Sequence, residues 1–374
     1  MAVTLRPGPD WVDAILAVWA EGDAVAPIDA RAPAAHVDRL LTMLAPGALV
    51  GLDGDRRSLG GGRPVEDGDA LVMPTSGTSA APKGVVLTHD AIAFAADSSN
   101  AVIDPDGDAH WLACLPLHHI GGFSVITRAL RTGTRPEVHD GFDADRVRLA
   151  AAAGCTHTSL VPTTLGRIDP SWFRLILVGG SAIPTDRPAN CVATYGMTES
   201  CAGVVYDGRP LPGVDLRIAD PAPNGIGAIE LRSPGLFRCY RDGSRPIDAD
   251  GWFRTADVGS IDADGLLSVA GRADDVIITG GENIWPEEVE RVLRTHVGVA
   301  DVAIIGRPDG EWGQVVTAVV IPVDPAAPPS LASLRDLARG FLPTAAVPRA
   351  LELVTDLPTT SLGKIRRAAL RDQG

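Results

Sequence analysis

Residues 75–84 read Thr75-Ser76-Gly77-Thr78-Ser79-Ala80-Ala81-Pro82-Lys83-Gly84, and this decapeptide determines how the rest of the chain is interpreted. It follows the apolar run Ala70-Leu71-Val72-Met73, which predicts a short buried strand. Glycine lets a backbone approach a ligand closely, while successive N–H groups and hydroxyls form a concave anion site. A lysine adds a point charge suited to phosphate. We therefore predict a loop that binds nucleotide phosphates through Thr75, Ser76, Gly77, Thr78, Ser79 and Lys83.

This loop differs from the common P-loop, in which Gly-Lys is followed by a Ser or Thr that ligates magnesium. Here Lys83 precedes Gly84, and Val85 follows, so the hydroxyls come before the lysine. The alternative is a solvent-exposed Ser/Gly loop. The preceding strand and the ordered Pro-Lys-Gly ending favour the phosphate site.

The composition limits the partners of the chain. Its 374 residues are 45% hydrophobic and carry a formal net charge of -14. Such an acidic chain is a poor candidate for binding nucleic acid or anionic membranes, so any polyanion site must be locally basic or rich in backbone donors. The five cysteines are scattered, and no signal peptide or apolar stretch long enough for a membrane span is seen. We expect a cytoplasmic protein.

The pattern of apolar residues predicts an α/β fold. Helical spacing marks residues 10–20, 34–44 and 144–153, and the apolar run 175–178 predicts a buried strand that ends at Gly179-Gly180. Short alternating strands then follow between Pro, Gly and Asp turns. We predict a large N-terminal α/β domain (1–272) with a β-rich subdomain (about 203–272), and a small α+β C-terminal domain (273–374).

A second motif, Tyr195-Gly196-Met197-Thr198-Glu199, carries groups suited to a nucleotide. Glu199 is a hard oxygen ligand for magnesium. Thr198 can bond a phosphate oxygen, Tyr195 can stack on a purine, and Gly196 leaves room for the backbone to approach. The alternative for an isolated Thr-x-Glu is a helix cap.

Together these motifs resemble the adenylate-forming superfamily of acyl-CoA synthetases, luciferases and adenylation domains of peptide synthetases. Further elements match in the family's order: Leu115–Gly122, Gly179–Ala182, Gly251–Asp257, Gly271–Asp275, Gly280–Asn283 and Ser361–Arg367. Relatives usually carry far more sequence before the phosphate loop, so the resemblance implies a shortened N-terminal domain. Ala256 stands where glycine is usual, which is tolerated if its φ is negative.

The resemblance implies roles for the matching residues. ATP or AMP is expected to contact the phosphate loop together with Gly179, Gly180, Ser181, Tyr195, Gly196, Asp257 and Arg272. Asp274 is expected to be the hinge of a mobile C-terminal domain, and Gly280 and Gly281 to line the path of coenzyme A. Lys364 is expected to enter the site during adenylation, with Thr198, Glu199 and His119 as further catalytic residues. Arg366 and Arg367 are expected to lie in a solvated tail.

The short form also resembles compact o-succinylbenzoate–CoA ligases of menaquinone synthesis, whose substrate carries two carboxylates. The expected substrate contacts are His119, Gly121 and Arg128. Arg128 could neutralise the carboxylate that does not react, through a bidentate contact. The alternative is a surface arginine on a helix. Gly121 replaces a serine found in some of those ligases.

The implied function is an ATP-dependent carboxylic acid–CoA ligase that uses Mg²⁺ and forms an acyl-adenylate. Three alternatives stay open: a synthetase for another aryl or fatty acid, an acyl-AMP ligase that loads a carrier protein, and a non-catalytic nucleotide-binding protein. The expected partners are a small carboxylic acid and coenzyme A, without nucleic acid, and the chain is expected to form a homodimer.

Overall fold

The computed structural model describes residues 1–75, 83–180, 186–359 and 365–371. Its contacts divide the chain into two compact units, of which the first contains Met1–Leu216 and Leu231–Phe253. The second contains Arg217–Glu230 and Arg254–Gly374. The fold is mixed α/β, as predicted, whereas the predicted boundary at residue 272 stays a prediction.

The largest sheet of the first unit has the strand order β13-β12-β11-β10-β9-β7-β8. Strands β8, β7, β9, β10 and β11 are parallel, and β12 and β13 are antiparallel to their neighbours. The strand bounds are Trp111–Ala113 (β7), Glu137–Val138 (β8), His157–Leu160 (β9), Leu175–Val178 (β10), Cys191–Met197 (β11), Ala202–Tyr206 (β12) and Arg209–Pro210 (β13). Ile176, Leu177 and Val178 of β10 are buried, as expected of a strand covered on both faces.

Two smaller sheets complete the first unit. One has the order β2-β1-β3-β4, with bounds Ala26–Pro27 (β2), Ala2–Val3 (β1), Ala48–Val50 (β3) and Arg56–Ser58 (β4). The other has the order β16-β6-β5, with bounds Cys239–Tyr240 (β16), Lys83–Thr88 (β6) and Asp69–Thr75 (β5). Thr75 pairs with Lys83 across the antiparallel strands β5 and β6, so both ends of the predicted phosphate loop lie on paired strands. The sequence predicts β5 but not β6, because Lys83 and Gly84 at its start belong to a motif that is typical of a loop.

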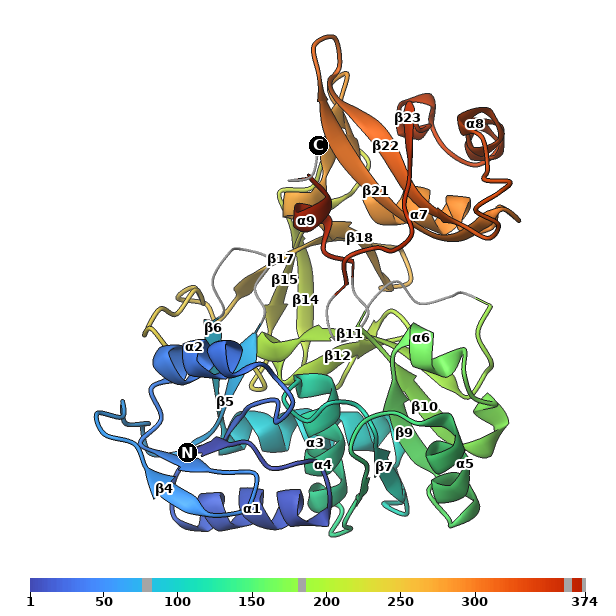
Figure 1. Cartoon of the computed structure of the whole chain (residues 1–374). Coiled ribbons are helices and arrows are strands. Elements are labelled where there is room, and N and C mark those ends of the chain that lie inside the picture. The colour runs from blue at the N-terminus through green and yellow to red at the C-terminus, as the bar shows by residue number, and fades with distance from the viewer. Residues whose placement is uncertain (76–82, 181–185, 360–364, 372–374) are drawn as a thin grey trace. The chain divides into compact units, whose positions relative to one another are not determined.

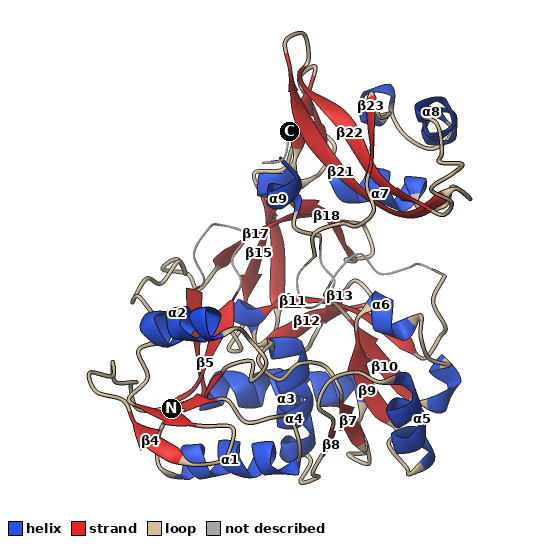
Figure 2. Cartoon of the chain, viewed as in Figure 1, coloured by secondary structure: helices blue, strands red, loops and turns tan. Residues whose placement is uncertain are grey.

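The helices of the first unit cover the sheets (Figure 2). Their bounds are Pro9–Ala20 (α1), Ala34–Leu44 (α2), His89–Ile103 (α3), Ile120–Arg131 (α4), Ala144–Ala152 (α5) and Pro162–Leu165 (α6). The predicted helices 10–20, 34–44 and 144–153 are confirmed as α1, α2 and α5. The Thr88 hydroxyl caps α3 by accepting a hydrogen bond of 3.1 Å from the Ala91 amide. Helices α3 and α4 pack against each other and against β12 (Figure 1).

The second unit holds a five-stranded sheet and most of a four-stranded one. The four-stranded sheet has the order Asp215–Ala219 (β14), Gly227–Arg232 (β15), Phe253–Ile261 (β17) and Leu267–Arg272 (β18). The other has the order Glu282–Ile284 (β20), Ile277–Thr279 (β19), Gly313–Pro322 (β22) and Val299–Asp309 (β21), with Ala350–Leu353 (β23) also paired to β22. Its helices are Pro286–Leu293 (α7), Leu331–Arg339 (α8) and Arg367–Arg371 (α9).

Arg367 corrects one expectation from the sequence. It lies on α9, its side chain is only 5% exposed, and it forms ion pairs with Asp275, Glu287 and Glu290. A buried arginine needs such partners, because an unpaired charge is costly to bury. Arg366 is exposed, as predicted. Among the helices of the described ranges, none is long and apolar enough to span a membrane.

Candidate active site

The carboxyl edge of the parallel strands gathers several predicted site residues. The segment leading to His119 follows β7, Gly179 follows β10, and the Tyr195–Glu199 motif completes β11 and the turn after it. Carboxyl ends of neighbouring parallel strands meet at one edge of a sheet, where ligands bind in open α/β folds. The fold of the first unit therefore places His119, Gly179 and the Tyr195–Glu199 motif along a common edge.

Gly179 and Gly180 are required by the backbone at this edge. A Cβ on Gly179 would lie 2.7 Å from the Thr194 hydroxyl oxygen, and Gly180 has a φ of 92°. The first position has no room for a side chain, and the second has a conformation that favours glycine. The predicted role of this backbone in adenine binding stays a prediction, and Ser181 lies outside the described residues.

The Tyr195–Glu199 motif forms the end of β11 and the start of the turn to β12. A Cβ on Gly196 would lie 1.9 Å from the Ala202 carbonyl oxygen, so only glycine fits there. The register of the two strands shifts between Tyr195 and Gly196. Ser200 is fully buried, and its hydroxyl accepts a 3.0 Å hydrogen bond from the Met197 amide. These features fix the backbone that carries Glu199.

Glu199 and Lys83 meet at the side chain of Tyr240. The Tyr240 hydroxyl donates a 2.9 Å hydrogen bond to Glu199 Oε1, and Lys83 Nζ lies 4.6 Å from the centroid of the Tyr240 ring. Burial, and then the charge of Glu199, raises the pKa of Tyr240, so its hydroxyl stays a neutral donor. The two predicted motifs are thereby joined through a tyrosine that the sequence interpretation missed. A signal was present, since Tyr240 is one of three tyrosines in the chain and lies between Arg238 and Arg241.

Replacing Tyr240 by phenylalanine is expected to raise the KM for MgATP by about three- to tenfold, because a hydrogen bond to a charged group that orients Glu199 is lost. Excess Mg²⁺ should partly restore the KM if Glu199 holds the metal. Steady-state kinetics at varied ATP and Mg²⁺ measures both effects. Tyr206→Phe is the matched control, because the Tyr206 hydroxyl contacts Ser99 at 2.8 Å and not Glu199. An unchanged KM for Tyr240→Phe would contradict this role.

His119 is held in a neutral state at the start of α4. It is the N-cap residue of that helix, and its ring centroid lies 4.4 Å from that of His118. Burial, and then the charge of His118, lowers the pKa of His119 to about 4. A neutral imidazole suits a positioning role in the site, because adenylation depends on positioning more than on proton transfer.

The two glycines that follow His119 differ in the space around them. A Cβ on Gly121 would meet only Leu115 Cδ1 at 3.9 Å, an ordinary contact. On Gly122 it would lie 2.4 Å from the Pro116 carbonyl oxygen and 2.7 Å from that of Leu115. Gly122 therefore allows the chain to turn into α4.

We expect Gly122→Ala to destabilise the protein by about 1–3 kcal/mol, as overpacking does, and Gly121→Ala to change stability far less. Denaturant unfolding of the two variants beside the parent chain tests this. Equal stability of both variants would show that the backbone of the turn adjusts without cost.

Arg128 is buried, which excludes the alternative of a surface arginine. It is 4% exposed on α4, its Nε donates a 3.0 Å hydrogen bond to the Ser99 hydroxyl, and its guanidinium carbon lies 5.4 Å from the Trp111 ring centroid. No carboxylate of the described residues forms an ion pair with it, and its Nη1 has no hydrogen-bond partner among them. The structure thus shows a buried cation without a matching anion.

The second unit brings Asp257 and Arg272 together. They are cross-strand partners on β17 and β18, and Arg272 Nη1 lies 3.3 Å from Asp257 Oδ1. Ala256 lies inside β17 and is not among the residues with positive φ, so alanine fits where the family usually has glycine. The two predicted nucleotide contacts therefore form one polar pair, and their roles stay predictions.

The predicted hinge and coenzyme A residues also lie in the second unit. Asp274 is exposed in the turn Ala273–Asp275, directly after β18. Gly280 and Gly281, with φ of 58° and 85°, form the two-residue turn between β19 and β20. Positive φ at both central positions is the hairpin geometry that glycine favours. The remaining predicted site residues lie outside the described residues: Ser76, Gly77, Thr78, Ser79, Ser181 and Lys364.

Comparison with known proteins identifies the family. The pattern of AMP-binding enzymes matches residues 61–241, and that of the AMP-binding enzyme C-terminal domain matches residues 288–364. The probable 2-succinylbenzoate–CoA ligase of Mycobacterium tuberculosis is 37% identical over 354 residues, which cover 86% of this chain and 90% of that protein. The chain therefore belongs to the AMP-binding enzymes, the adenylate-forming family predicted from its motifs.

Other relatives differ in what their names say they act on. The indoleacetate–CoA ligase of Aromatoleum aromaticum is 34% identical, over 80% of this chain and 66% of its own length. The 2-succinylbenzoate–CoA ligase of Listeria monocytogenes is 31% identical, over 81% of this chain and 70% of its own length.

Solved structures have the same fold. The o-succinylbenzoate CoA synthetase of Bacillus subtilis, bound to its acyl-adenylate intermediate, aligns with a TM-score of 0.88 and 26% identity. The alignment covers 100% of this chain and 88% of that one. The amide bond synthetase of Marinactinospora thermotolerans aligns with a TM-score of 0.86 and 27% identity, over 99% of this chain and 89% of its own.

Proposed function

We propose that the protein is an ATP-dependent acid–thiol ligase that activates 2-succinylbenzoate as an acyl-adenylate and transfers the acyl group to coenzyme A. In the first half-reaction the substrate carboxylate attacks the α-phosphate of ATP and pyrophosphate leaves. In the second, the thiol attacks the acyl carbon and AMP leaves. Membership of the family and the two ligases named for this acid support the proposal.

The residues of the site fit ATP with magnesium. Mg²⁺ is usually held by one or two carboxylates together with substrate phosphates. In the described part of the chain, no three His, Cys, Asp or Glu side chains gather as metal ligands, so Glu199 with the phosphates is the arrangement we propose. Bound magnesium would neutralise charge on the phosphates. Lys83, which lies over the ring of the tyrosine that donates to Glu199, supplies a cation for the phosphates.

The burial of Arg128 is the observation that most supports 2-succinylbenzoate as the acid substrate. A buried guanidinium without a carboxylate partner is costly, and an anion from a ligand would compensate it. Two further buried atoms beside it, Trp111 Nε1 and Asn100 Oδ1, also lack partners among the described residues. We propose that Arg128 binds the second carboxylate of 2-succinylbenzoate, the one that does not react.

Arg128→Gln is expected to raise the KM for 2-succinylbenzoate by about ten- to a hundredfold, because one hydrogen bond between charged groups is lost. For 4-oxo-4-phenylbutanoate, which lacks the ring carboxylate, the same variant should change the KM little. Pyrophosphate release with both acids, and with aryl, aliphatic and dicarboxylic acids as a panel, measures the difference. A thermal melt checks that the variant is folded. Equal losses for both acids would show that Arg128 acts on the fold instead.

The acceptor is tested separately from the acid. We propose coenzyme A, with a phosphopantetheinylated carrier protein as the competing acceptor. Thioester formation assayed with each acceptor separates the two. If none of the tested carboxylates supports ATP–pyrophosphate exchange, the result would favour a non-catalytic nucleotide-binding protein. A homodimer and a cytoplasmic location belong to the same proposal. Light scattering tests the first, and cell fractionation the second.

A further inference from the structure

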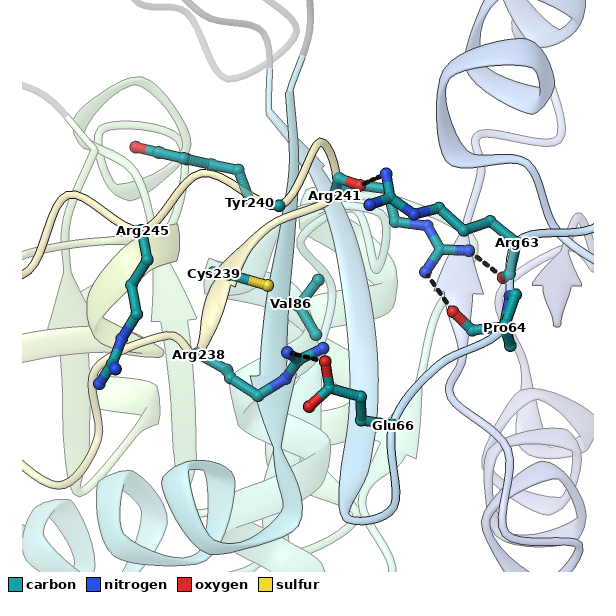
Figure 3. Close-up of a pocket in the computed structure, with 10 residues that line it drawn as sticks. Arg63, Pro64, Glu66, Val86, Arg238, Cys239, Tyr240, Arg241 and Arg245 are labelled. Carbon is teal, nitrogen blue, oxygen red and sulfur yellow. Dashed lines mark hydrogen bonds and ion pairs between the residues drawn. The ribbon is translucent and has the colours of Figure 1, made fainter.

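A cavity of about 430 Å³ in the first unit is lined by an unusual number of arginines (Figure 3). Its walls come from β16 and the residues after it, from Val86 on β6, and from residues 63–66. Four guanidinium groups line it: those of Arg63, Arg238, Arg241 and Arg245. We call this cavity the arginine pocket. Its volume lies in the range of small-molecule sites, which is about 300–1,000 Å³.

One of the four arginines is neutralised by the protein itself. Arg238 forms a two-pronged pair with the buried carboxylate of Asp69, at 2.8 Å from each nitrogen to its oxygen, and reaches Glu66 Oε1 at 2.6 Å. Glu66 also lines the pocket, and its carboxylate is paired with Arg238. The two carboxylates together outweigh the single guanidinium, so this group of side chains contributes a net negative charge to the pocket.

The charge of Arg241 is not neutralised in this way. Its side chain is buried, and the groups that accept its hydrogen bonds are the backbone carbonyls of Leu44, Ala45, Arg63 and Pro64. Burial, and then the charge of Arg63, lowers the pKa of Arg241. Carbonyl dipoles hold the guanidinium in place but carry no negative charge, so the pocket keeps a positive field.

Arg63 and Arg245 add positive charge to the pocket from opposite sides. Arg63 donates to the Arg241 carbonyl, and the two side chains lie together at one side of the pocket in Figure 3. Arg245 lies beyond Val86 and Cys239, is exposed, and forms no hydrogen bond or ion pair with the rest of the described chain. In a chain of net charge -14, this local excess of guanidinium groups needs an explanation.

Phosphate is the ligand chemistry that fits. Guanidinium groups bind phosphate oxygens with charge-assisted, two-pronged hydrogen bonds. The pocket also shares Tyr240 with the Lys83 and Glu199 cluster, so it adjoins the proposed nucleotide site. We propose that the arginine pocket is a second anion site, which binds a phosphate group of a small molecule through Arg63 and Arg245, while Arg241, whose hydrogen bonds go to backbone carbonyls, adds its positive charge. If the proposed function holds, two of the enzyme's own reactants carry such a group: pyrophosphate, and coenzyme A with its 3′-phosphate.

Direct titration calorimetry with inorganic pyrophosphate tests the site without relying on catalysis. The wild-type protein is expected to show a binding event that is weakened about tenfold in Arg245→Gln and further in the double variant with Arg63→Gln. Lys83→Ala should retain this event, because Lys83 does not line the pocket. Arg57→Gln is the matched control, since Arg57 is exposed on β4, away from the pocket residues.

Coenzyme A and 3′-dephospho-coenzyme A distinguish the two sources. If the 3′-phosphate occupies the pocket, Arg245→Gln weakens the binding of coenzyme A and leaves that of the dephospho form unchanged. If pyrophosphate occupies it, only pyrophosphate binding weakens. The proposal is overturned if Arg245→Gln and the double variant bind all three ligands as the wild type does. If Arg245→Gln weakens ligand binding but the wild-type protein has no ligase activity, the proposed function is wrong and the anion site still stands.

Discussion

Replacing Arg367 by alanine is expected to destabilise the protein by about 3–5 kcal/mol, the cost of removing the closest cation from the buried carboxylate of Glu290, which keeps only Arg294 at 3.5 Å. Arg367 Nη2 lies 2.8 Å from Glu290 Oε1, and both side chains are at most 5% exposed. Its Nη1 lies 3.0 Å from Asp275 and 2.8 Å from Glu287. Denaturant unfolding monitored by circular dichroism measures the loss.

The loss should depend on pH. Burial raises the pKa of Glu290 even with Arg367 present, and removing the arginine raises it further. A carboxyl group with a raised folded pKa takes up a proton more readily in the folded state, so its cost is present at high pH and disappears below the unfolded pKa. The destabilisation by Arg367→Ala should therefore be larger at pH 8 than at pH 5.

Arg366 provides the control from the neighbouring position. Its side chain is exposed, so Arg366→Ala should change stability by less than about 0.5 kcal/mol. Adding Glu290→Gln to Arg367→Ala should recover part of the lost stability, since the buried charge is then gone. If the two single arginine variants were equally stable, the buried ion pairs would contribute nothing to the fold.

Replacing Lys364 by alanine is expected to lower the rate of adenylation by about a hundred- to a thousandfold, as loss of a preorganised charge at a transition state does. The same variant should convert supplied acyl-adenylate and coenzyme A to the thioester at nearly the parent rate. The reason is that the resemblance assigns Lys364 to the first half-reaction only. Pyrophosphate exchange measures the first step, and thioester formation from synthetic adenylate measures the second.

The structure supports this test through the residues that flank Lys364. Thr359 and Ile365 form an antiparallel bridge, and Ile365 packs against the core that contains Leu357 and Leu370. The lysine thus precedes an anchored residue, and alanine there leaves the anchor intact. Arg366→Ala serves again as the control and should keep both half-reactions. If Lys364→Ala slowed both half-reactions equally, the expectation that the C-terminal domain takes a different position in each half-reaction would be contradicted.

Several elements could be predicted because their determinants are local. The helices 10–20 and 34–44 follow from apolar spacing within one segment, and the structure has them at Pro9–Ala20 and Ala34–Leu44. The motifs single out the glycines at 179, 180 and 196. The structure explains them by close contacts at the Cβ positions of Gly179 and Gly196 and by the positive φ of Gly180. The strand β6 could not be predicted, because its first residues, Lys83 and Gly84, belong to the phosphate motif, whose residue types are typical of a loop.

By itself, the sequence determined the family and the chemistry of its separate motifs, because phosphate-binding glycines, hydroxyls and a lysine act within a few consecutive residues. Only the tertiary structure decided what surrounds them. Tyr240 joins Lys83 to Glu199, and Arg128 is a buried cation and not a surface one. The physical reason is that burial and pairing of charges depend on strands and helices far apart in the chain, and the free energy of a charge is set by those neighbours.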